Sequence, residues 1–135
     1  MKQGPSLNTA REDHGCARLR DGSILVAGGW GVEIVGGANN LGVFKSTEIL
    51  EVGDHEWKNG PDLKEGVKLN EVVKSNGRDY IAYSIGGWEY GRASSKIYGL
   101  NVDRNEWQIV DNLKEPRYKG SAVNVPSNLI PWCKD

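Results

Sequence analysis

Apolar residues in this chain fall in short runs separated by polar, glycine-containing turns. The clearest runs are Ile24–Ala27 and Tyr80–Ile85, and each ends on a pair of glycines. The first run is apolar without alternation, which is typical of a strand buried on both faces. No segment keeps apolar residues at the i, i+3, i+4 and i+7 spacing of an amphipathic helix. The pattern therefore predicts an all-β chain.

The same landmarks recur along the chain. The tetrapeptide that ends at Leu7 (Gly-Pro-Ser-Leu) is matched by the one that ends at Leu63 (Gly-Pro-Asp-Leu), and more weakly by residues 111–113. Leu63 follows Leu7 by 56 residues, and Leu113 follows Leu63 by 50. The difference lies in two loops while the strands keep their register, as a repeat fold allows. A repeat of roughly fifty residues made of short strands predicts the blade of a β-propeller.

Each unit is expected to form a four-stranded antiparallel blade, with strands A to D in chain order. The first unit has its strands at 14–19, 24–28, 46–52 and around Trp57; the second has them at 69–75, 80–85, 96–102 and around Trp107. Asp21 and Gly22 between the first two strands are a strong hairpin signal.

A third unit begins after the second. Arg117 precedes residues 121–125, which align with strand A, and the pattern stops at Pro126. The expected fold is thus one partial propeller over 1–135: a blade at 11–60, a blade at 67–112, and a lone strand with its tail at 117–135. Because propellers have about four to eight blades, we expect the remaining blades to be missing from this chain and the unpaired strand edges to be exposed. The chain is expected to be the C-terminal part of a larger propeller, whose lone third strand pairs with strands B to D from an N-terminus absent here.

The net charge and the hydropathy of the chain indicate which classes of partner are disfavoured. The chain carries 17 basic and 18 acidic side chains, a net charge of −1. Such a balance does not favour nucleic acid or an anionic membrane surface, and no apolar stretch approaches the roughly 20 residues of a membrane span. No signal peptide is visible, which weakly favours the cytoplasm, although an N-terminus further upstream would leave the compartment open.

The candidate chemistry is sparse. His14 and His55 have no partner at metal-ligand spacing, and no serine nucleophile elbow, Cys-His pair or phosphate loop is present. We therefore expect no cofactor, no metal and no catalysis, with His14 a satisfied core histidine. Cys16 is expected to be a buried reduced thiol, and two free thiols are favoured over a disulfide to Cys133.

The repeated residues resemble the kelch repeat. The carriers of the resemblance are listed here: Gly28 and Gly29 with Trp57; Gly86 and Gly87 with Tyr98 and Trp107; and Arg11, His14 and Gly15 at the start of strand A. Two departures stand out, because Glu48 replaces the family's tyrosine in the first unit and Val67 replaces its arginine in the second. The glycine pairs are expected to permit close approach between blades rather than phosphate binding, and the two strand-D tryptophans to pack within the blade.

Recognition is expected on the face where the B–C and D–A connections emerge together, because loops on a rigid scaffold carry binding. The candidate residues are Trp30, Glu33, Phe44, Lys45, Trp88, Glu89, Tyr90, Arg92, Arg11 and Arg117. Two alternatives stay open: Trp30 and Trp88 could equally cap the blade core, and the arginines at the start of strand A could pair with neighbouring carboxylates. Residues 36–40 are expected to form a mobile loop tip.

The sequence thus predicts a non-catalytic protein-binding scaffold or adaptor with an unidentified protein partner. The resemblance implies a substrate receptor of a cullin-based ubiquitin ligase or an actin-binding type. The alternatives are a fragment of a secreted or enzymatic kelch-like propeller, of galactose oxidase or sialic acid epimerase type, and a degenerate fragment that does not fold.

Overall fold

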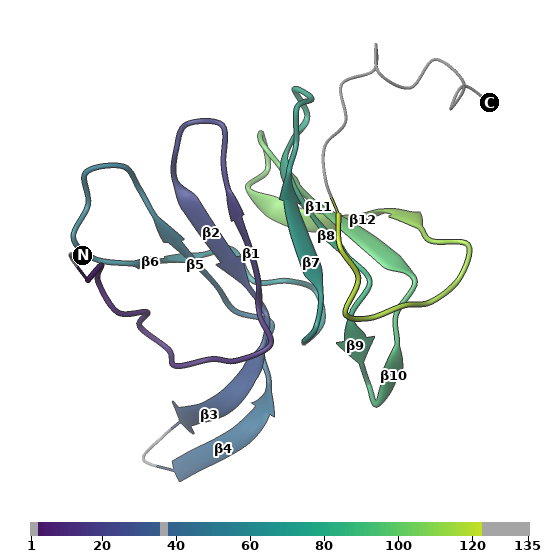
Figure 1. The fold of residues 1–135 in the computed structure, drawn as a ribbon, viewed down its shortest axis with the longest axis horizontal. Coiled ribbons are helices and arrows are strands. Elements are labelled where there is room, and N and C mark those ends of the chain that lie inside the picture. The colour runs from purple at the N-terminus through teal and green to yellow at the C-terminus, as the bar shows by residue number, and fades with distance from the viewer. Residues whose placement is uncertain (1–2, 36–37, 123–135) are drawn as a thin grey trace.

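The computed structural model of the protein describes residues 3–35 and 38–122 (Figure 1). Throughout these two stretches the secondary structure is β, and none of it is helical. The described chain accordingly offers no helix that could cross a membrane. Two four-stranded antiparallel sheets stand side by side, so the predicted all-β, blade-like fold class is confirmed.

The first sheet has the strand order β1, β2, β5, β6. Its strands are β1 (Gly15–Arg18), β2 (Ile24–Ala27), β5 (Thr47–Leu50) and β6 (Lys58–Gly60). The hairpin between β1 and β2 turns at Gly22, whose φ is 91°, and the Ser23 amide donates to the Asp21 carboxylate over 2.9 Å. Glycine accepts this left-handed backbone without strain, so the predicted hairpin is confirmed.

The second sheet repeats this arrangement in the order β7, β8, β11, β12. Its strands are β7 (Glu71–Lys74), β8 (Tyr80–Ile85), β11 (Lys96–Asn101) and β12 (Glu106–Asn112). Each strand falls at its predicted place, and each sheet is a meander of neighbouring antiparallel strands. The two units are therefore structural copies of each other.

Both connections between the second and third strand of a sheet form two-stranded ribbons. The first ribbon pairs β3 (Trp30–Val35) with β4 (Ala38–Val43), and the second pairs β9 (Trp88–Glu89) with β10 (Arg92–Ala93). The prediction of a mobile loop tip at 36–40 is therefore wrong for residues 38–40, which belong to β4, while residues 36 and 37 lie outside the described residues. The β-branched residues of β3 favour a strand.

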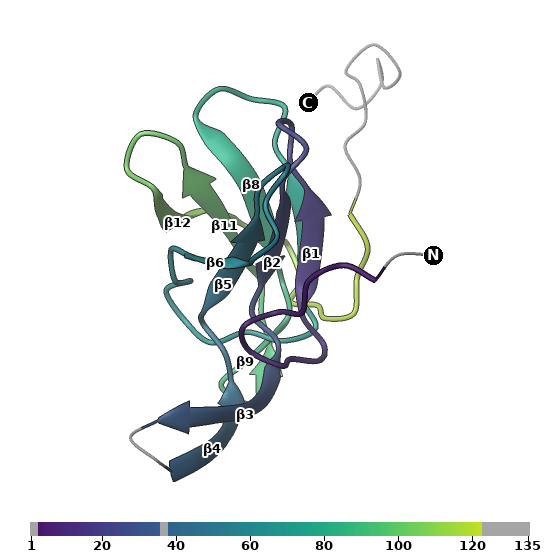
Figure 2. The ribbon, with the colours of Figure 1, turned by 90° about the vertical axis from the view of Figure 1, so that its left-hand side faces the viewer.

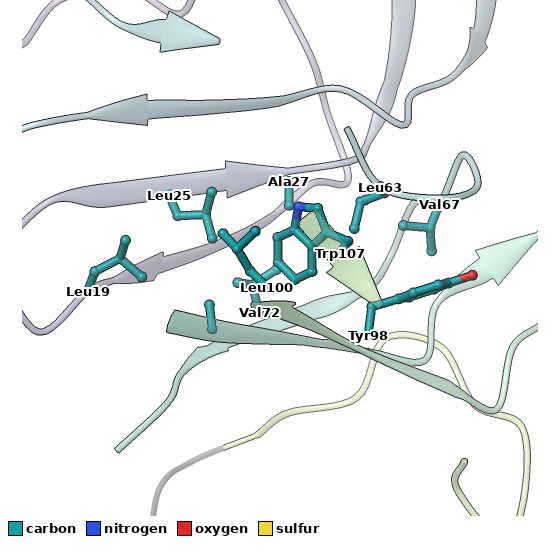
Figure 3. Close-up of a cluster of buried hydrophobic side chains, with 10 residues drawn as sticks. Leu19, Leu25, Ala27, Leu63, Val67, Val72, Tyr98, Leu100 and Trp107 are labelled. Atoms are coloured by element: carbon teal, nitrogen blue, oxygen red, sulfur yellow. The ribbon is translucent and has the colours of Figure 1, made fainter. Parts of the chain in front are cut away.

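The hydrophobic core lies between the two sheets, where β1 contacts β7. Its buried members are Leu19, Leu25, Ala27, Leu63, Val67, Val72, Ala82, Tyr98, Leu100 and Trp107 (Figure 3). Trp107 is fully buried and donates its indole N–H to the Pro61 carbonyl over 3.0 Å, as Trp57 does to the Pro5 carbonyl over 2.9 Å. The strand-D tryptophans thus pack within the units, as predicted.

The glycine pairs lie where one unit touches the chain segment of the next. Gly29 donates its backbone N–H to the Val67 carbonyl over 2.8 Å, and Gly87 donates to the Arg117 carbonyl over 2.9 Å. A Cβ added at Gly28 would lie 2.3 Å from the Val67 carbonyl oxygen, a distance that no side chain tolerates. The glycines therefore permit close approach between units, which confirms their predicted role.

The segment after the second sheet repeats the junction geometry. Asp13 and Leu69 precede the first strand of their sheets, Lys119 follows the second sheet, and the three residues have φ of 54°, 57° and 55°. The Leu69 amide donates to the Asp13 carbonyl over 2.7 Å, and the Lys119 amide donates to the Leu69 carbonyl over 3.0 Å. Ser121 and Ala122 carry no strand, and the rest of the predicted lone strand and its tail lies outside the described residues.

The prediction of a buried thiol at Cys16 is wrong, because this side chain is exposed. Strand β1 is the first strand of its sheet and pairs only with β2. Successive side chains of a strand point to opposite faces, so Gly15 is buried against Val72 while Cys16 points the other way. Cys133 lies outside the described residues.

Candidate functional site

Both ribbons and the three segments that lead into strand A lie at one end of the sheets, which we call the ribbon face (Figures 1 and 2). Residues 8–13 pair with the first ribbon through Glu12 and Trp30, and residues 64–69 pair with the second through Lys68 and Trp88. These bridges hold each connecting segment against the base of a ribbon. The predicted juxtaposition of the B–C and D–A connections is thus confirmed.

Five side chains form a row along the ribbon face: Glu12, Trp30, Lys68, Trp88 and Tyr118, which we call the tryptophan row. The Lys68 ammonium lies 5.2 Å from the centre of the Trp30 ring, within the range of a cation–π contact. Tyr118 meets Trp88 edge to face, with ring centres 5.1 Å apart. Each unit therefore sends one side chain onto the tryptophan of the unit before it.

Two cavities open beside the row at repeat-related positions. The first has a volume of about 340 Å³ and is lined by Ala10, Arg11, Glu12, Trp30 and Gly31. The second has a volume of about 380 Å³ and is lined by Val43, Gly66, Lys68, Trp88, Tyr90 and Gly91. Because Trp30 and Trp88 are half-buried and line these cavities, each tryptophan packs on the protein with one part of its surface and leaves the other part accessible.

Tyr90 is the most exposed aromatic residue of the described chain, with 74 % of its surface accessible. It sits with Gly91 in the turn between β9 and β10, where both residues have positive φ of 49° and 77°. This backbone is that of the two-residue hairpin turn that suits twisted strands. The Tyr90 hydroxyl donates a hydrogen bond to the Glu65 carboxylate. This bond holds the Tyr90 side chain where it lines the second cavity.

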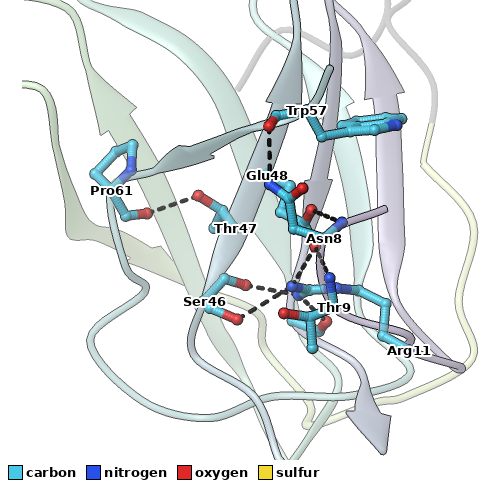
Figure 4. A network of polar contacts seen from close by, with 9 residues as sticks. Asn8, Thr9, Arg11, Ser46, Thr47, Glu48, Trp57 and Pro61 are labelled. Atoms are coloured by element: carbon cyan, nitrogen blue, oxygen red, sulfur yellow. Dashed lines mark hydrogen bonds and ion pairs between the residues drawn. The ribbon is translucent and has the colours of Figure 1, made fainter. Parts of the chain in front are cut away.

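Arg11 is buried rather than exposed on the ribbon face, which corrects the prediction that it contacts a partner. Its guanidinium is fully buried and pairs with Glu48 at 2.8 Å, and it also donates to the carbonyls of Gly28 and Ser46 at 2.9 Å each (Figure 4). The alternative pairing with a neighbouring carboxylate is thus the one observed. Glu48 is the counter-ion that the buried Arg11 requires.

The Glu48 carboxylate also binds the beginning of the chain. It accepts hydrogen bonds from the backbone amides of Asn8 at 2.6 Å and Thr9 at 3.2 Å. Three donors therefore converge on one buried carboxylate (Figure 4). A buried charge is tolerated when it is paired and hydrogen-bonded in this way.

The second unit forms its ion pair on different residues, and this pair is buried only on its Glu89 side. Val67 and Tyr98 occupy the positions of Arg11 and Glu48, while Glu89 is 4 % exposed and pairs with Lys96 at 3.1 Å. Burial, and then the charge of the nearby Glu89, raise the pKa of the Tyr98 hydroxyl above its ordinary value. The prediction that Glu89 faces a partner is therefore wrong, since its carboxylate is buried in its own unit and pairs with Lys96.

The remaining predicted site residues divide between surface and interior. Phe44 is 4 % exposed and packs under Arg11, whose guanidinium lies 5.2 Å from the ring centre, so it does not face a partner. Lys45 and Arg92 are exposed, and Arg117 is exposed 3.9 Å from Glu115. Glu33 belongs to strand β3.

His14 is half-buried, and its Nδ1 is buried with no hydrogen-bond partner among the described residues, so the prediction of a satisfied core histidine is wrong. Burial, and then the positive charge of Arg11, lower the pKa of His14 below 6.5. The unfolded chain therefore binds this proton more readily, and stability should fall as the pH drops from 7 through the folded-state pKa. We expect His14→Gln to reduce this loss between pH 7 and pH 5 in urea titrations.

The exposed His55 supplies the control for this prediction. The variant His55→Gln should keep the pH dependence of the wild-type chain. An equal flattening in both variants would show that the dependence has another source.

Sequence reasoning missed three members of the tryptophan row: Glu12, Lys68 and Tyr118. Their signal was available, because each residue directly follows the strand-A arginine or its counterpart at 11, 67 and 117. What the sequence could not supply was the pairing of Glu12 and Lys68 with the tryptophans, which depends on contacts about twenty residues apart along the chain.

No family model matches this chain, and no curated protein matches it either. Among residues 3–35 and 38–122, no group of three or more His, Cys, Asp or Glu side chains is placed to hold a metal ion.

Proposed function

We propose that the chain is part of a kelch-type β-propeller and that it binds a protein partner through the ribbon face, without catalysing a reaction. The repeat geometry supports the kelch assignment: two four-stranded sheets with glycine pairs closing their second strands, and indole-to-proline hydrogen bonds within each unit. On the strength of the resemblance, we propose a scaffold or adaptor role of the substrate-receptor or actin-binding type.

The tryptophan row with its two cavities is the observation that carries the binding proposal. Tryptophan, tyrosine and arginine are the side chains most enriched at the energetic centres of protein interfaces. Here Trp30 and Trp88 are accessible in cavities, Tyr90 projects from a hairpin turn and Arg92 is exposed beside it. The sheets beneath hold these groups in fixed positions, which lowers the ordering cost of binding.

Lys119 supports a further part of the proposal, namely that more blades follow the second sheet in the assembled propeller. Its left-handed backbone and its hydrogen bond to Leu69 repeat the junction that Leu69 makes with Asp13. A third unit attached in this way would cover the second sheet as the second covers the first.

The double variant Tyr90→Ala/Arg92→Ala tests the binding proposal. Both side chains are exposed, so the fold should persist while the captured partner falls at least about tenfold, as expected for residues central to an interface. The measurement is quantitative mass spectrometry of proteins cross-linked to the immobilised chain.

The matched control is Val52→Ala/Val102→Ala, which alters two exposed side chains in turns at the opposite end of the sheets. Capture should be unchanged in this variant. Unchanged capture by Tyr90→Ala/Arg92→Ala, with circular dichroism showing an intact fold, would contradict binding through the ribbon face.

A further inference from the structure

The two cavities of the ribbon face are copies in position but opposite in charge. Glu12 lines the first and Lys68, its counterpart 56 residues later, lines the second. Both residues form the same kind of backbone bridge, each to the tryptophan of its own unit. The Lys68 ammonium, however, extends over the ring of Trp30 at 5.2 Å from its centre, so a partner in the first cavity meets the Glu12 carboxylate and this ammonium group next to the same tryptophan.

Both charges are available to a partner. Glu12 is exposed, and neither Glu12 nor Lys68 forms an ion pair with any residue that the structure describes. Arg11 also lines the first cavity, but its charge is already balanced by Glu48. Glu65 accepts a hydrogen bond from the hydroxyl of Tyr90, which lines the second cavity.

Lys68 joins the two cavities into one path. Its backbone pairs with Trp88 in the second cavity, with the Trp88 amide donating to the Lys68 carbonyl over 2.7 Å. Its ammonium lies over the ring of Trp30, which lines the first cavity. Trp30 therefore lies between Glu12 and the Lys68 ammonium, and Trp88 and Tyr118 continue the apolar surface beyond Lys68.

We infer that the ribbon face binds an extended peptide segment of a protein partner that carries one basic and one acidic side chain in a fixed order. The basic side chain pairs with Glu12, the acidic one pairs with Lys68, and an apolar residue between them lies on Trp30. A further apolar residue beyond the acidic one lies on Trp88. This inference rests on the proposed protein-binding function and adds the chemistry and the direction of the partner. Charge placement of this kind sets register and specificity more than affinity.

A phage-displayed library of random dodecapeptides, selected on the full chain, tests the inference. We expect enriched peptides to carry a basic and an acidic residue in one N-to-C order, outnumbering the reverse order at least about tenfold. The variant Glu12→Lys/Lys68→Glu keeps the net charge and exchanges the two sites. It should select the reverse order.

The control Glu51→Lys/Lys58→Glu exchanges an exposed ion pair that joins the end of β5 to the first residue of β6, away from the ribbon face. It should select the same order as the wild-type chain. Peptides enriched on both wild type and Glu12→Lys/Lys68→Glu with one shared order, or with no charge order, would overturn the inference and leave the proposed function standing. A selection that enriches nothing above an uncoated surface would contradict the proposed function itself.

Discussion

Replacing Gly28 with alanine should lower the free energy of unfolding by about 2–5 kcal/mol, combining left-handed strain with a steric clash between the two units. The new Cβ would lie 2.3 Å from the Val67 carbonyl oxygen, and this oxygen is fixed by its hydrogen bond from Gly29. Relief requires the two units to move apart where the core joins them. Urea denaturation followed by tryptophan fluorescence measures the loss.

Gly53→Ala is the matched control for this substitution. Gly53 also has a positive φ, 86°, but an added Cβ would find no heavy atom within 4 Å. Its loss should be confined to the left-handed strain of about 1–2 kcal/mol. Equal losses at Gly28 and Gly53 would show that the contact between units costs nothing and that the glycine pair serves only its own backbone.

Arg11→Val should cost about 3–5 kcal/mol of unfolding free energy, because it leaves the Glu48 carboxylate buried without its counter-ion. The side chains of Arg11 and Glu48 are 0 % and 1 % exposed, so water cannot replace the lost partner. Glu48→Tyr should be costly for the same reason, with the guanidinium left unpaired.

The double variant Arg11→Val/Glu48→Tyr installs the residues that the second unit carries at these positions. We expect its loss to be clearly smaller than the sum of the two single losses, because no unpaired charge remains. The exposed pair of Lys58 and Glu51 provides the control, and Lys58→Ala should cost less than about 1 kcal/mol. Additive single losses, or an Arg11→Val loss no larger than that of Lys58→Ala, would contradict a coupled buried pair.

The strand order and the role of the glycine pairs could be predicted from the sequence, because both depend on local signals. Ile24–Ala27 is apolar throughout and is followed by Gly28 and Gly29, so burial and close approach were both visible. The ribbon of β3 and β4 was missed although β-branched residues precede the paired glycines at 36 and 37. Two adjacent glycines after such a run are themselves typical of the sequence of a two-residue hairpin turn.

The burial of Arg11 and Glu89 could not be predicted, because burial of a charge depends on a partner distant in sequence or on another strand. Glu48 lies 37 residues after Arg11, and only the folded sheet brings the two together. In the sequence, Glu48 and Val67 each appear as a separate loss of the repeat pattern. In the structure each unit has an ion pair of its own, which is fully buried for Arg11 and Glu48 and partly exposed at Lys96 for Glu89 and Lys96.

The hydrogen bonds that join successive units at Asp13, Leu69 and Lys119 run between backbone groups, whereas the ion pairs of Arg11 and Lys96 each stay within one unit. A gene encoding such a chain can therefore duplicate or lose a whole unit by unequal recombination, because the new junction can form the same backbone hydrogen bonds. Each unit carries its own ion pair with it, and the backbone hydrogen bonds of the junction form whatever the side chains are, so the apolar side chains of the core are what a new neighbour has to match.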